Sequence, residues 1–504
     1  MRTTANVVAI SGIIGHKVPL PRAKPRPIEA VQQTEQTKKS MSISDRPAAA
    51  RGPDMRPGGI WRTEFTETVA LSVPIALTQL GQIAMMTTDL MLLGRLGEHV
   101  VASAGLAHTV LFVAFTIGMG LVAAVAPLAA QSFGARNPRG VRRALRVGVW
   151  AAILAGVPLT AFQFSGETML IALGQSPDNA AIAGRYLAGL GWSLIPAWVF
   201  MAIRGFMGAV NRPEPALWIT LVAVPSNFVL AWALIHGAFG LPRLDVLGAG
   251  IATTIINVAM CVVALVICVT RRPFKKYHVL ARFWRFDGPL LGTLCRLGLP
   301  ISGAYLVEFG VFGGAGLLMG TISTTALAAH QIALQIAAIL FMVPFGISMA
   351  ATVRVGHAVG REDASGARRA GIAALILGAG FMALMTAVIA ATRHALPPMF
   401  LGAISPETAA SAALTATLLL VGPLFFVFDG VQTIGAGALR GLNDTRIPFL
   451  IAIFSFWGIG FTSCWVLGVH TTLGPLGVWL GLSAGLIAHA ILLAWRFHRM
   501  TARP

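Results

Sequence analysis

The stretch GARNPRGVRR at residues 134–143 recurs as GREDASGARR at residues 360–369, 226 positions further along the chain. The same offset relates LSVPI at residues 71–75 to LGLPI at residues 297–301. Because one register holds from the first pair to the second, the chain is predicted to consist of two homologous halves. Any fold that we propose must therefore be built twice.

The composition of the chain excludes an ordinary soluble protein. Hydrophobic residues make up 56% of the 504 residues and charged residues only 11%, against roughly 25% charged residues in soluble domains. The apolar runs are far longer than the ~10-residue alternating strands of a transmembrane β-barrel. We therefore predict an all-α polytopic membrane protein. Four cysteines lack the spacing of metal ligands or of a disulfide framework: Cys261, Cys268, Cys295 and Cys464.

Twelve stretches approach the ~20 apolar residues that a helix needs to cross the hydrocarbon core of a bilayer. These predicted spans are residues 68–93, 102–130, 144–164, 184–208, 215–238, 247–270, 292–321, 325–352, 370–392, 410–437, 447–469 and 475–496. Six spans in each half give both halves the same orientation, so the repeats are parallel and a substrate site is expected between them. We assign spans 1–6 to an N-lobe at residues 63–275, spans 7–12 to a C-lobe at residues 286–498, and residues 276–285 to a linker loop.

Residues 1–62 differ in composition from the rest of the chain. They are rich in proline, small and basic residues, and they cannot bury enough apolar surface to offset the entropy of ordering. We expect this tail to be disordered. Translation from Met41 or Met55 is an alternative explanation of its presence.

The basic residues are distributed unequally between the two sides of the predicted bundle. If both termini are cytoplasmic, 34 of the 38 lysines and arginines fall in the tail, the cytoplasmic loops and the C-terminus. The opposite side holds Arg95, Arg185, Arg243 and Arg393. This asymmetry follows the positive-inside rule and predicts cytoplasmic termini. It also accounts for the net charge of +19 without nucleic acid as a partner.

Three acidic residues lie within predicted spans: Asp89 in span 1, Glu308 in span 7 and Asp429 in span 10. A carboxylate in the middle of the membrane costs at least ~2.5 kcal/mol, so such residues usually serve a function. No lysine or arginine lies within one helical turn of any of them, which excludes a local ion pair. Each can carry a proton, bind a metal cation or neutralise a cationic organic substrate. A neutral carboxyl held by a neighbouring helix is the structural alternative, and the residues alone leave all four open.

Three uncharged polar residues are candidates to assist these acids. Asn227 follows a helix-kinking proline in span 5 and is a candidate partner for a cation at Asp89. Gln82 and Gln432 are candidates to line the cavity between the lobes.

The repeat offset shows that the acids of the two lobes are not equivalent. Asp89 corresponds to Ala315 in the second half, and Glu308 corresponds to Gln82 in the first. The sequence therefore predicts two chemically distinct lobes that face a shared cavity.

Several motifs, taken in order, resemble the multidrug and toxic compound extrusion (MATE) family. They are MTTDLMLLG at residues 86–94, GARNPRGVRR at residues 134–143, LAAHQI at residues 327–332, and DGVQ at residues 429–432 followed by LRG at residues 439–441. The resemblance covers nearly all of residues 63–496. The presence of both Glu308 and Asp429 is most similar to the bacterial NorM-type branch.

This resemblance implies a V-shaped bundle in the inner membrane that exports cationic amphipathic drugs by alternating access, in exchange for inward H⁺ or Na⁺. It implies that Asp89 is the N-lobe coupling acid, assisted by Asn227, and that Glu308 and Asp429 are the C-lobe acids. We expect no cofactor and a monomeric protein, and Asp89 and Asn227 would bind the metal if the ion is Na⁺. Family members often carry a second polar residue one turn after that asparagine, where this chain has Ala231, and this departure favours protons.

Two other functions compete with export. A lipid-linked precursor flippase of the same broad superfamily would need several basic residues inside the cavity to meet phosphates. The spans are expected to carry none, with Arg204 and its counterpart Arg440, offset by 236 positions, counted among the cytoplasmic loops. An intramembrane enzyme is not expected, because the sequence has no catalytic motif and no cluster of metal ligands. It has no phosphate-binding glycine-rich loop either, so an ion gradient must supply the energy.

Overall fold

The computed structural model describes residues 57–401 and 408–502. The disorder that we predict for the tail lies outside the described residues. The first described helix begins at Pro57, so residues 57–62, which we assigned to the tail, belong to a helix. Proline suits a helix start because the N–H that it lacks would have no partner there.

Helices make up the described part of the chain, which contains no strand. They are α2 (Pro57–Gly94), α3 (Glu98–Ala123), α4 (Val125–Gly134), α5 (Pro138–Phe164), α6 (Gly166–Ala172), α7 (Pro177–Leu190), η3 (Gly191–Ser193), α8 (Leu194–Ala209), α9 (Glu214–His236), η4 (Ala238–Gly240), α10 (Asp245–Thr270), η5 (Phe274–Tyr277), α11 (Gly288–Ile322), α12 (Thr324–Gly360), α13 (Ala364–Thr392), α14 (Leu396–Leu401), α15 (Ala409–Gly441), α16 (Arg446–Ala452), η6 (Ile453–Phe461), α17 (Thr462–Val469) and α18 (Pro475–Thr501).

The number of membrane spans agrees with the sequence. Eleven helical segments of the described chain are long and apolar enough to cross a membrane. A pair of helices bent by 51°, Ala409–Gly422 with Leu424–Gly441, brings the number to twelve. The predicted all-α polytopic membrane fold is therefore confirmed.

Besides the bent pair, three spans are interrupted. The second span is interrupted at Ala124 between α3 and α4, and the fourth contains the 3₁₀ turn η3 between α7 and α8. The eleventh contains η6, a π-helix of nine residues, between α16 and α17. π-Helical segments are rare in proteins, and those that occur often lie at functional sites.

The two copies of the repeated stretch form the same turn between helices. Asn137 and Asp363, which are equivalent in the repeat, each accept a hydrogen bond on Oδ1 from the backbone N–H three residues later, at 2.9 and 2.7 Å. The residue before each cap, Arg136 in one half and Glu362 in the other, has a positive φ of 53° and 60°. The repeated stretch recurs in the sequence because the same type of helix cap is formed in each half.

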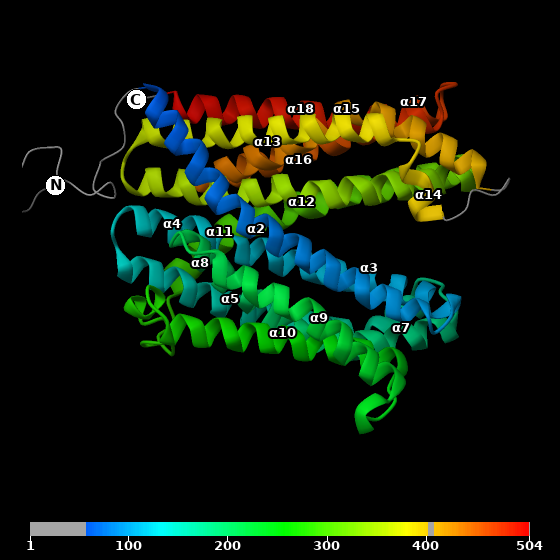
Figure 1. Cartoon of the computed structure of the whole chain (residues 1–504), viewed down its shortest axis with the longest axis horizontal. Coiled ribbons are helices and arrows are strands. Elements are labelled where there is room, and N and C mark those ends of the chain that lie inside the picture. The colour runs from blue at the N-terminus through cyan, green and yellow to red at the C-terminus, as the bar shows by residue number, and fades with distance from the viewer. Residues whose placement is uncertain (1–56, 402–407, 503–504) are drawn as a thin grey trace, which may run out of the picture. The chain divides into compact units, whose positions relative to one another are not determined.

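The two halves contact each other through helices that are also related by the repeat. Helix α12 packs against α2 and α4, while α11 packs against α3. Figure 1 shows α2 crossing α12 before it continues alongside α3. Along these contacts Gly120 lies against the backbone of Ser302, and Gly346 lies against Ala76, with the same offset of 226 between the equivalent members. A Cβ at Gly120 would lie 2.3 Å from the backbone nitrogen of Ser302, so no larger residue fits there.

A second repeated contact joins α4 to α12 near the predicted cytoplasmic side. We call it the glycine seam and define it by Gln131, Gly134, His357 and Gly360. A Cβ at Gly134 would lie 2.2 Å from the carbonyl oxygen of His357, and one at Gly360 would lie 2.1 Å from the carbonyl oxygen of Gln131. Since the obstacle in both cases is main chain, the two helices can approach this closely only with glycine at both positions.

The predicted linker loop between the lobes packs against the first half. Arg146 Nη1 donates a hydrogen bond to the carbonyl oxygen of Arg282 at 3.1 Å, and Trp150 Nε1 donates to that of Phe283 at 3.1 Å. The indole of Trp150 also stacks on the ring of Phe283, with centroids 5.6 Å apart. These contacts fix residues 276–285 to helix α5.

Candidate functional site

The N-lobe acid is held by side chains from two other helices. Asp89 lies on α2 and is 4% exposed. Its Oδ1 accepts a hydrogen bond from Asn227 Nδ2 on α9 at 2.5 Å, and its Oδ2 accepts one from Thr253 Oγ1 on α10 at 2.7 Å. Both donors are uncharged, so Asp89 is fixed in place without a counter-ion.

The oxygen atoms around Asp89 can hold a proton or one small monovalent cation. Asn227 is fully buried, and its Oδ1 has no hydrogen-bond partner among the described residues. Together with the Asp89 carboxylate and Thr253 Oγ1, it gives a set of hard oxygen donors of the type that alkali and alkaline-earth cations prefer. Ala231 is buried one turn further on and supplies no donor. In the described part of the chain, no group of three His, Cys, Asp or Glu side chains is placed to hold a metal ion.

The C-lobe acids are joined through one glutamine. Gln432 Nε2 on α15 donates to Glu308 Oε1 on α11 at 2.8 Å and lies 3.2 Å from Asp429 Oδ1 on its own helix. The same nitrogen lies 3.0 Å from Thr433 Oγ1. Asp429 is 5% exposed, whereas Glu308 is partly exposed to a cavity. The structure therefore brings together the three residues that the sequence selected in this lobe.

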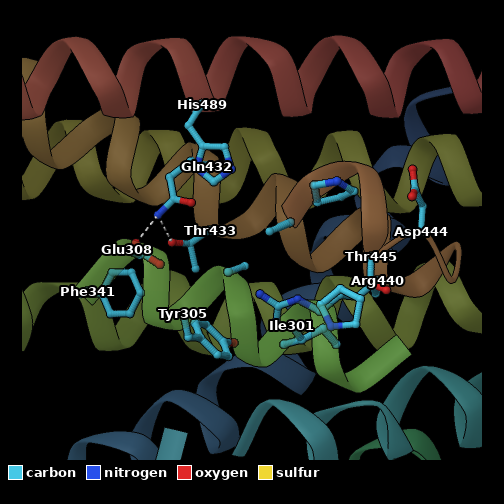
Figure 2. A pocket seen from close by; sticks show the side chains of 14 residues that line it. Ile301, Tyr305, Glu308, Phe341, Gln432, Thr433, Arg440, Asp444, Thr445 and His489 are labelled. Carbon is cyan, nitrogen blue, oxygen red and sulfur yellow. Dashed lines mark hydrogen bonds between the residues drawn. The ribbon is translucent and has the colours of Figure 1, made fainter. Parts of the chain in front are cut away.

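Figure 2 shows the cavity that Glu308 and Gln432 line, with the hydrogen bonds from Gln432 drawn as dashed lines. Its walls come from α11, α12, α15, α16 and α18 and from the turn after α15. The lining residues are Pro300, Ile301, Ala304, Tyr305, Glu308, Phe341, Gln432, Thr433, Ala436, Arg440, Asp444, Thr445, Pro448 and His489.

Gln82 is engaged with an arginine. Its Oε1 accepts a hydrogen bond from Arg204 Nη1 at 3.0 Å, and Gln79 Oε1 accepts one from the same nitrogen. Arg204 is 3% exposed and lies within α8, so the expectation that the spans carry no basic residue is wrong. The amide oxygens of the two glutamines replace water at Nη1, whereas Nε and Nη2 of Arg204 are buried without a hydrogen-bond partner among the described residues.

Two polar residues of the site escaped sequence analysis for different reasons. Thr253 is one of many threonines within apolar spans, and such threonines usually bond to their own helix, as Thr253 also does to Ala249. His489 lies in α18 far from any motif, and only its place in the cavity marks it out. Neither residue type carries a spacing signal that could have identified it.

The comparison with known protein families gives one match, which occurs twice along the chain. The model of the MatE family matches residues 74–233 and residues 300–466, which start 226 positions apart. The chain belongs to the MatE family. This membership confirms the resemblance drawn from the motifs.

Curated relatives of the MatE chain carry the NorM name. This chain is 64% identical over 441 residues to the "Probable multidrug resistance protein NorM" of Rhodopseudomonas palustris, and the match covers 88% of this chain and 93% of that protein. It is 39% identical to the "Multidrug resistance protein NorM" of Burkholderia vietnamiensis, over 86% of this chain and 94% of that one. The NorM-type branch of the family is therefore confirmed.

Solved MatE structures share the fold. The eukaryotic MATE transporter AtDTX14 superposes with a TM-score of 0.79 at 20% identity, over 88% of this chain and 98% of that one. An outward-facing multidrug resistance MATE family transporter of the MOP superfamily gives a TM-score of 0.80 at 19% identity, over 87% and 96%. These two structures show that the fold is shared. With the MatE match, the NorM relatives and the apolar helices, the chain is a multi-pass membrane transporter, not an enzyme, as the sequence predicts.

Proposed function

We propose that this MatE protein exports cationic amphipathic compounds in exchange for inward-moving H⁺ or Na⁺. The observation that carries the proposal is the surroundings of Asp89, a buried carboxylate whose hydrogen-bond partners are the uncharged Asn227 and Thr253. A lone negative charge in a membrane interior is unfavourable unless a cation or a proton neutralises it. Asp89 is therefore expected to bind a proton, a Na⁺ ion or a cationic drug at any time. Because the ion and the drug compete for this one carboxylate, the movement of one is coupled to the movement of the other.

The names of the relatives support drugs as the exported cargo. Both NorM proteins described above are called multidrug resistance proteins, and the structural neighbour in the outward-facing state is called a multidrug resistance transporter. A carboxylate held by neutral groups suits a cationic cargo of loosely defined shape. From the names of the relatives together with the Asp89 site, we propose that this chain also exports drugs.

Alternating access is the mechanism that we attach to this exchange. The glycine seam closes α4 against α12 on the side that the arginine distribution predicts to be cytoplasmic. An arrangement of this kind corresponds to a state that is shut toward the cytoplasm. Loss of the seam contacts would then accompany opening to that side.

Protons are the coupling ion that the N-lobe donors favour. Beside Asp89, the ligand set for Na⁺ consists of Asn227 Oδ1 and Thr253 Oγ1, because Ala231 supplies no oxygen. Na⁺ usually needs more oxygen ligands than three side chains provide, whereas a proton needs one carboxylate oxygen. We therefore place H⁺ ahead of Na⁺.

The flippase alternative has weaker support. Arg204 is buried, but two glutamine side chains occupy its Nη1. Arg440 lines the C-lobe cavity together with the acids Glu308 and Asp444, which would repel a phosphate. Neither arginine therefore forms the basic cluster that a lipid-linked pyrophosphate requires.

The remaining parts of the proposal concern the setting of the protein. We propose that it resides in the inner membrane with both termini in the cytoplasm, from the positive-inside asymmetry and its bacterial relatives. We propose that the monomer is the working unit, because both acid sites lie within one chain.

Efflux from proteoliposomes under separately imposed H⁺ and Na⁺ gradients tests the proposal. Asp89→Asn keeps the size of the side chain and removes its charge, so we expect normal insertion and loss of gradient-driven efflux. Asp178→Asn, at the exposed start of α7, is the matched control and should transport like the wild type. Full drug resistance and unchanged ion dependence in Asp89→Asn would show that this residue does not couple the two fluxes.

A further inference from the structure

The C-lobe cavity contains polar groups that the exchange at Glu308 does not use. His489 lines the cavity from α18 and is 4% exposed, and neither of its ring nitrogens has a hydrogen-bond partner among the described residues. Thr445 lines the same cavity, is 5% exposed and has a buried Oγ1 without a partner in the described chain. Buried polar groups are nearly always hydrogen-bonded, so both side chains point to water in this space.

The size of the cavity is suited to a short chain of water molecules. It offers about 40 Å³ to the centres of water-sized molecules. A buried water needs roughly 10–15 Å³ by this measure and two to four polar partners. The space therefore accommodates about three or four waters, and Glu308, Gln432, His489 and Thr445 supply the partners.

The cavity is elongated along the helices. Its lining residues on α11 run from Glu308 back to Pro300, and those on α15 run from Gln432 on to Arg440. Eight residues of α-helix correspond to about 12 Å along the axis. The cavity thus extends from the level of the C-lobe acids to the turn at residues 442–445, on the predicted cytoplasmic side.

His489 lies beside the acids at the inner end of this space. Figure 2 shows its imidazole reaching from α18 toward Gln432, above Thr433 and Glu308. Its ring packs edge-on against Phe456 of the π-helix η6, with centroids 4.8 Å apart at 67°. This ring contact orients the imidazole, whose nitrogens have no partner within residues 57–401 and 408–502.

Three charged residues of the described chain line the cavity together with His489. Glu308 lines the cavity from α11 and Arg440 from α15, and Asp444 lines its predicted cytoplasmic end. Asp429 contacts the amide of Gln432. Asp444 accepts a hydrogen bond from Arg496 Nε at 2.9 Å. Asp444 is therefore paired with Arg496, whereas the guanidinium of Arg440 lies over the ring of Tyr305, 5.4 Å from its centroid.

We propose that this cavity is a hydrated proton path between Glu308 and the cytoplasmic turn, and that His489 is a proton-carrying group within it. Glu308 gives its proton to a water molecule, which passes one of its own protons to a ring nitrogen of His489. The imidazolium then releases the proton on its other nitrogen to the water beside Thr445, and from there it reaches the cytoplasm. Only O–H and N–H bonds break and form, and the step leaves Glu308 as a carboxylate and His489 neutral.

This path rests on the proton form of the proposed antiport. His489→Gln keeps a polar side chain of similar length and removes the capacity to accept and release a proton. His489→Phe keeps a ring against Phe456 and removes both nitrogens. His498→Gln, on the exposed end of the same helix, is the matched control.

The three variants are to be compared in two assays. In proteoliposomes with an imposed pH gradient, we expect both His489 variants to lower the maximal efflux rate at least tenfold, with an unchanged apparent KM for the drug. In detergent, we expect the equilibrium dissociation constant of the drug to stay within twofold of the wild-type value. The control variant should match the wild type in both assays.

Each other outcome overturns a defined part of the reasoning. Efflux by His489→Gln within twofold of the wild-type rate would refute the path while leaving the antiport intact. Equal losses of drug binding and of efflux would assign His489 a structural role only and would also refute it. Wild-type efflux driven by Na⁺ alone would exclude a proton path but keep an antiporter, whereas wild-type efflux independent of both gradients would refute the proposed function itself.

Discussion

Replacing Gly360 with alanine tests whether α4 and α12 must touch for transport. The added Cβ would lie 2.1 Å from the carbonyl oxygen of Gln131, whereas ordinary contact begins at 3.4 Å. Because the obstacle is main chain, it cannot rotate away as a side chain can. The two helices must therefore separate by about 1.3 Å at this point.

Because α15 packs against α12, the same separation also breaks the hydrogen bonds that join Gln131 to the end of α15 and to the turn after it. Gln131 Nε2 donates to the carbonyl oxygen of Gly441 at 2.9 Å, and Gln131 Oε1 accepts from Asn443 Nδ2 at 2.7 Å. Each such bond contributes about 0.5–1.5 kcal/mol, and overpacking costs roughly 1–3 kcal/mol. The closed state should lose roughly 2–6 kcal/mol, and the lower value already shifts the equilibrium about 30-fold.

Distances between spin labels report this shift directly. Cysteines introduced at Arg139 and Ser365 on a cysteine-free background place the labels at exposed, repeat-equivalent positions on either side of the seam. We expect Gly360→Ala to enrich the longer distances and to reduce drug efflux in parallel. Gly380→Ala is the control, because a Cβ there meets no atom within 4 Å. A wild-type distance distribution and wild-type efflux in Gly360→Ala would refute the idea that the seam closes this side.

Three further substitutions have defined outcomes. Arg204→Leu removes the donor that binds Oε1 of Gln79 and of Gln82. Each buried polar group left without a partner costs about 1–3 kcal/mol, so the melting temperature in detergent should be clearly lower. Gln432→Leu removes the donor that links the C-lobe acids and should lower efflux about tenfold at normal expression, measured as resistance and as rate. The hydrogen bond from Arg143 holds the pKa of Asp287, in the loop before α11, below its ordinary value, so its stabilising effect is present at neutral pH and is lost as the pH falls through that pKa. Asp287→Asn should lower the free energy of unfolding at pH 7 by less than about 1 kcal/mol, which is seen as a slightly lower melting temperature. The difference from the wild type should vanish in acid.

The sequence was sufficient to predict the helices that cross the membrane but not their interruptions. Hydropathy and length identify a span because the bilayer demands about 20 apolar residues. They do not distinguish an α-helix from the π-helix η6 or from the break at Ala124, because these changes preserve the apolar character. The repeat, by contrast, was readable because the caps at Asn137 and Asp363 require specific residue types.

The candidate site was predictable only where a charge stood out against the apolar background. Asp89, Glu308 and Asp429 were found in this way, and the structure places each of them in a hydrogen-bonded site. The partners of a buried acid depend on helix packing, so Thr253 could not be chosen from the many hydroxyl residues in the spans. Gln82 was selected as polar, but its partner proved to be an arginine.

Two pairs of repeat positions serve different purposes in the two lobes. Gln82 corresponds to Glu308, and Arg204 corresponds to Arg440. In the N-lobe the neutral glutamine accepts a hydrogen bond from the buried guanidinium, which keeps its charge. In the C-lobe the glutamate and the arginine line the same cavity, and the glutamate binds an amide instead.

This exchange of glutamine for glutamate gives the lobes different charge balances. With all acids ionised, the N-lobe site holds one carboxylate, Asp89, whereas the C-lobe site holds two, Glu308 and Asp429, which Gln432 joins. A low-dielectric interior disfavours uncompensated charge, so the C-lobe must retain one proton or cation, and its histidine can carry that charge while an acid is ionised. The hydrogen-bond partners of Asp89, Asn227 and Thr253, are uncharged, so Asp89 can release its ion when a cationic substrate takes that ion's place. The N-lobe is therefore suited to exchange, and the C-lobe to holding and delivering the proton.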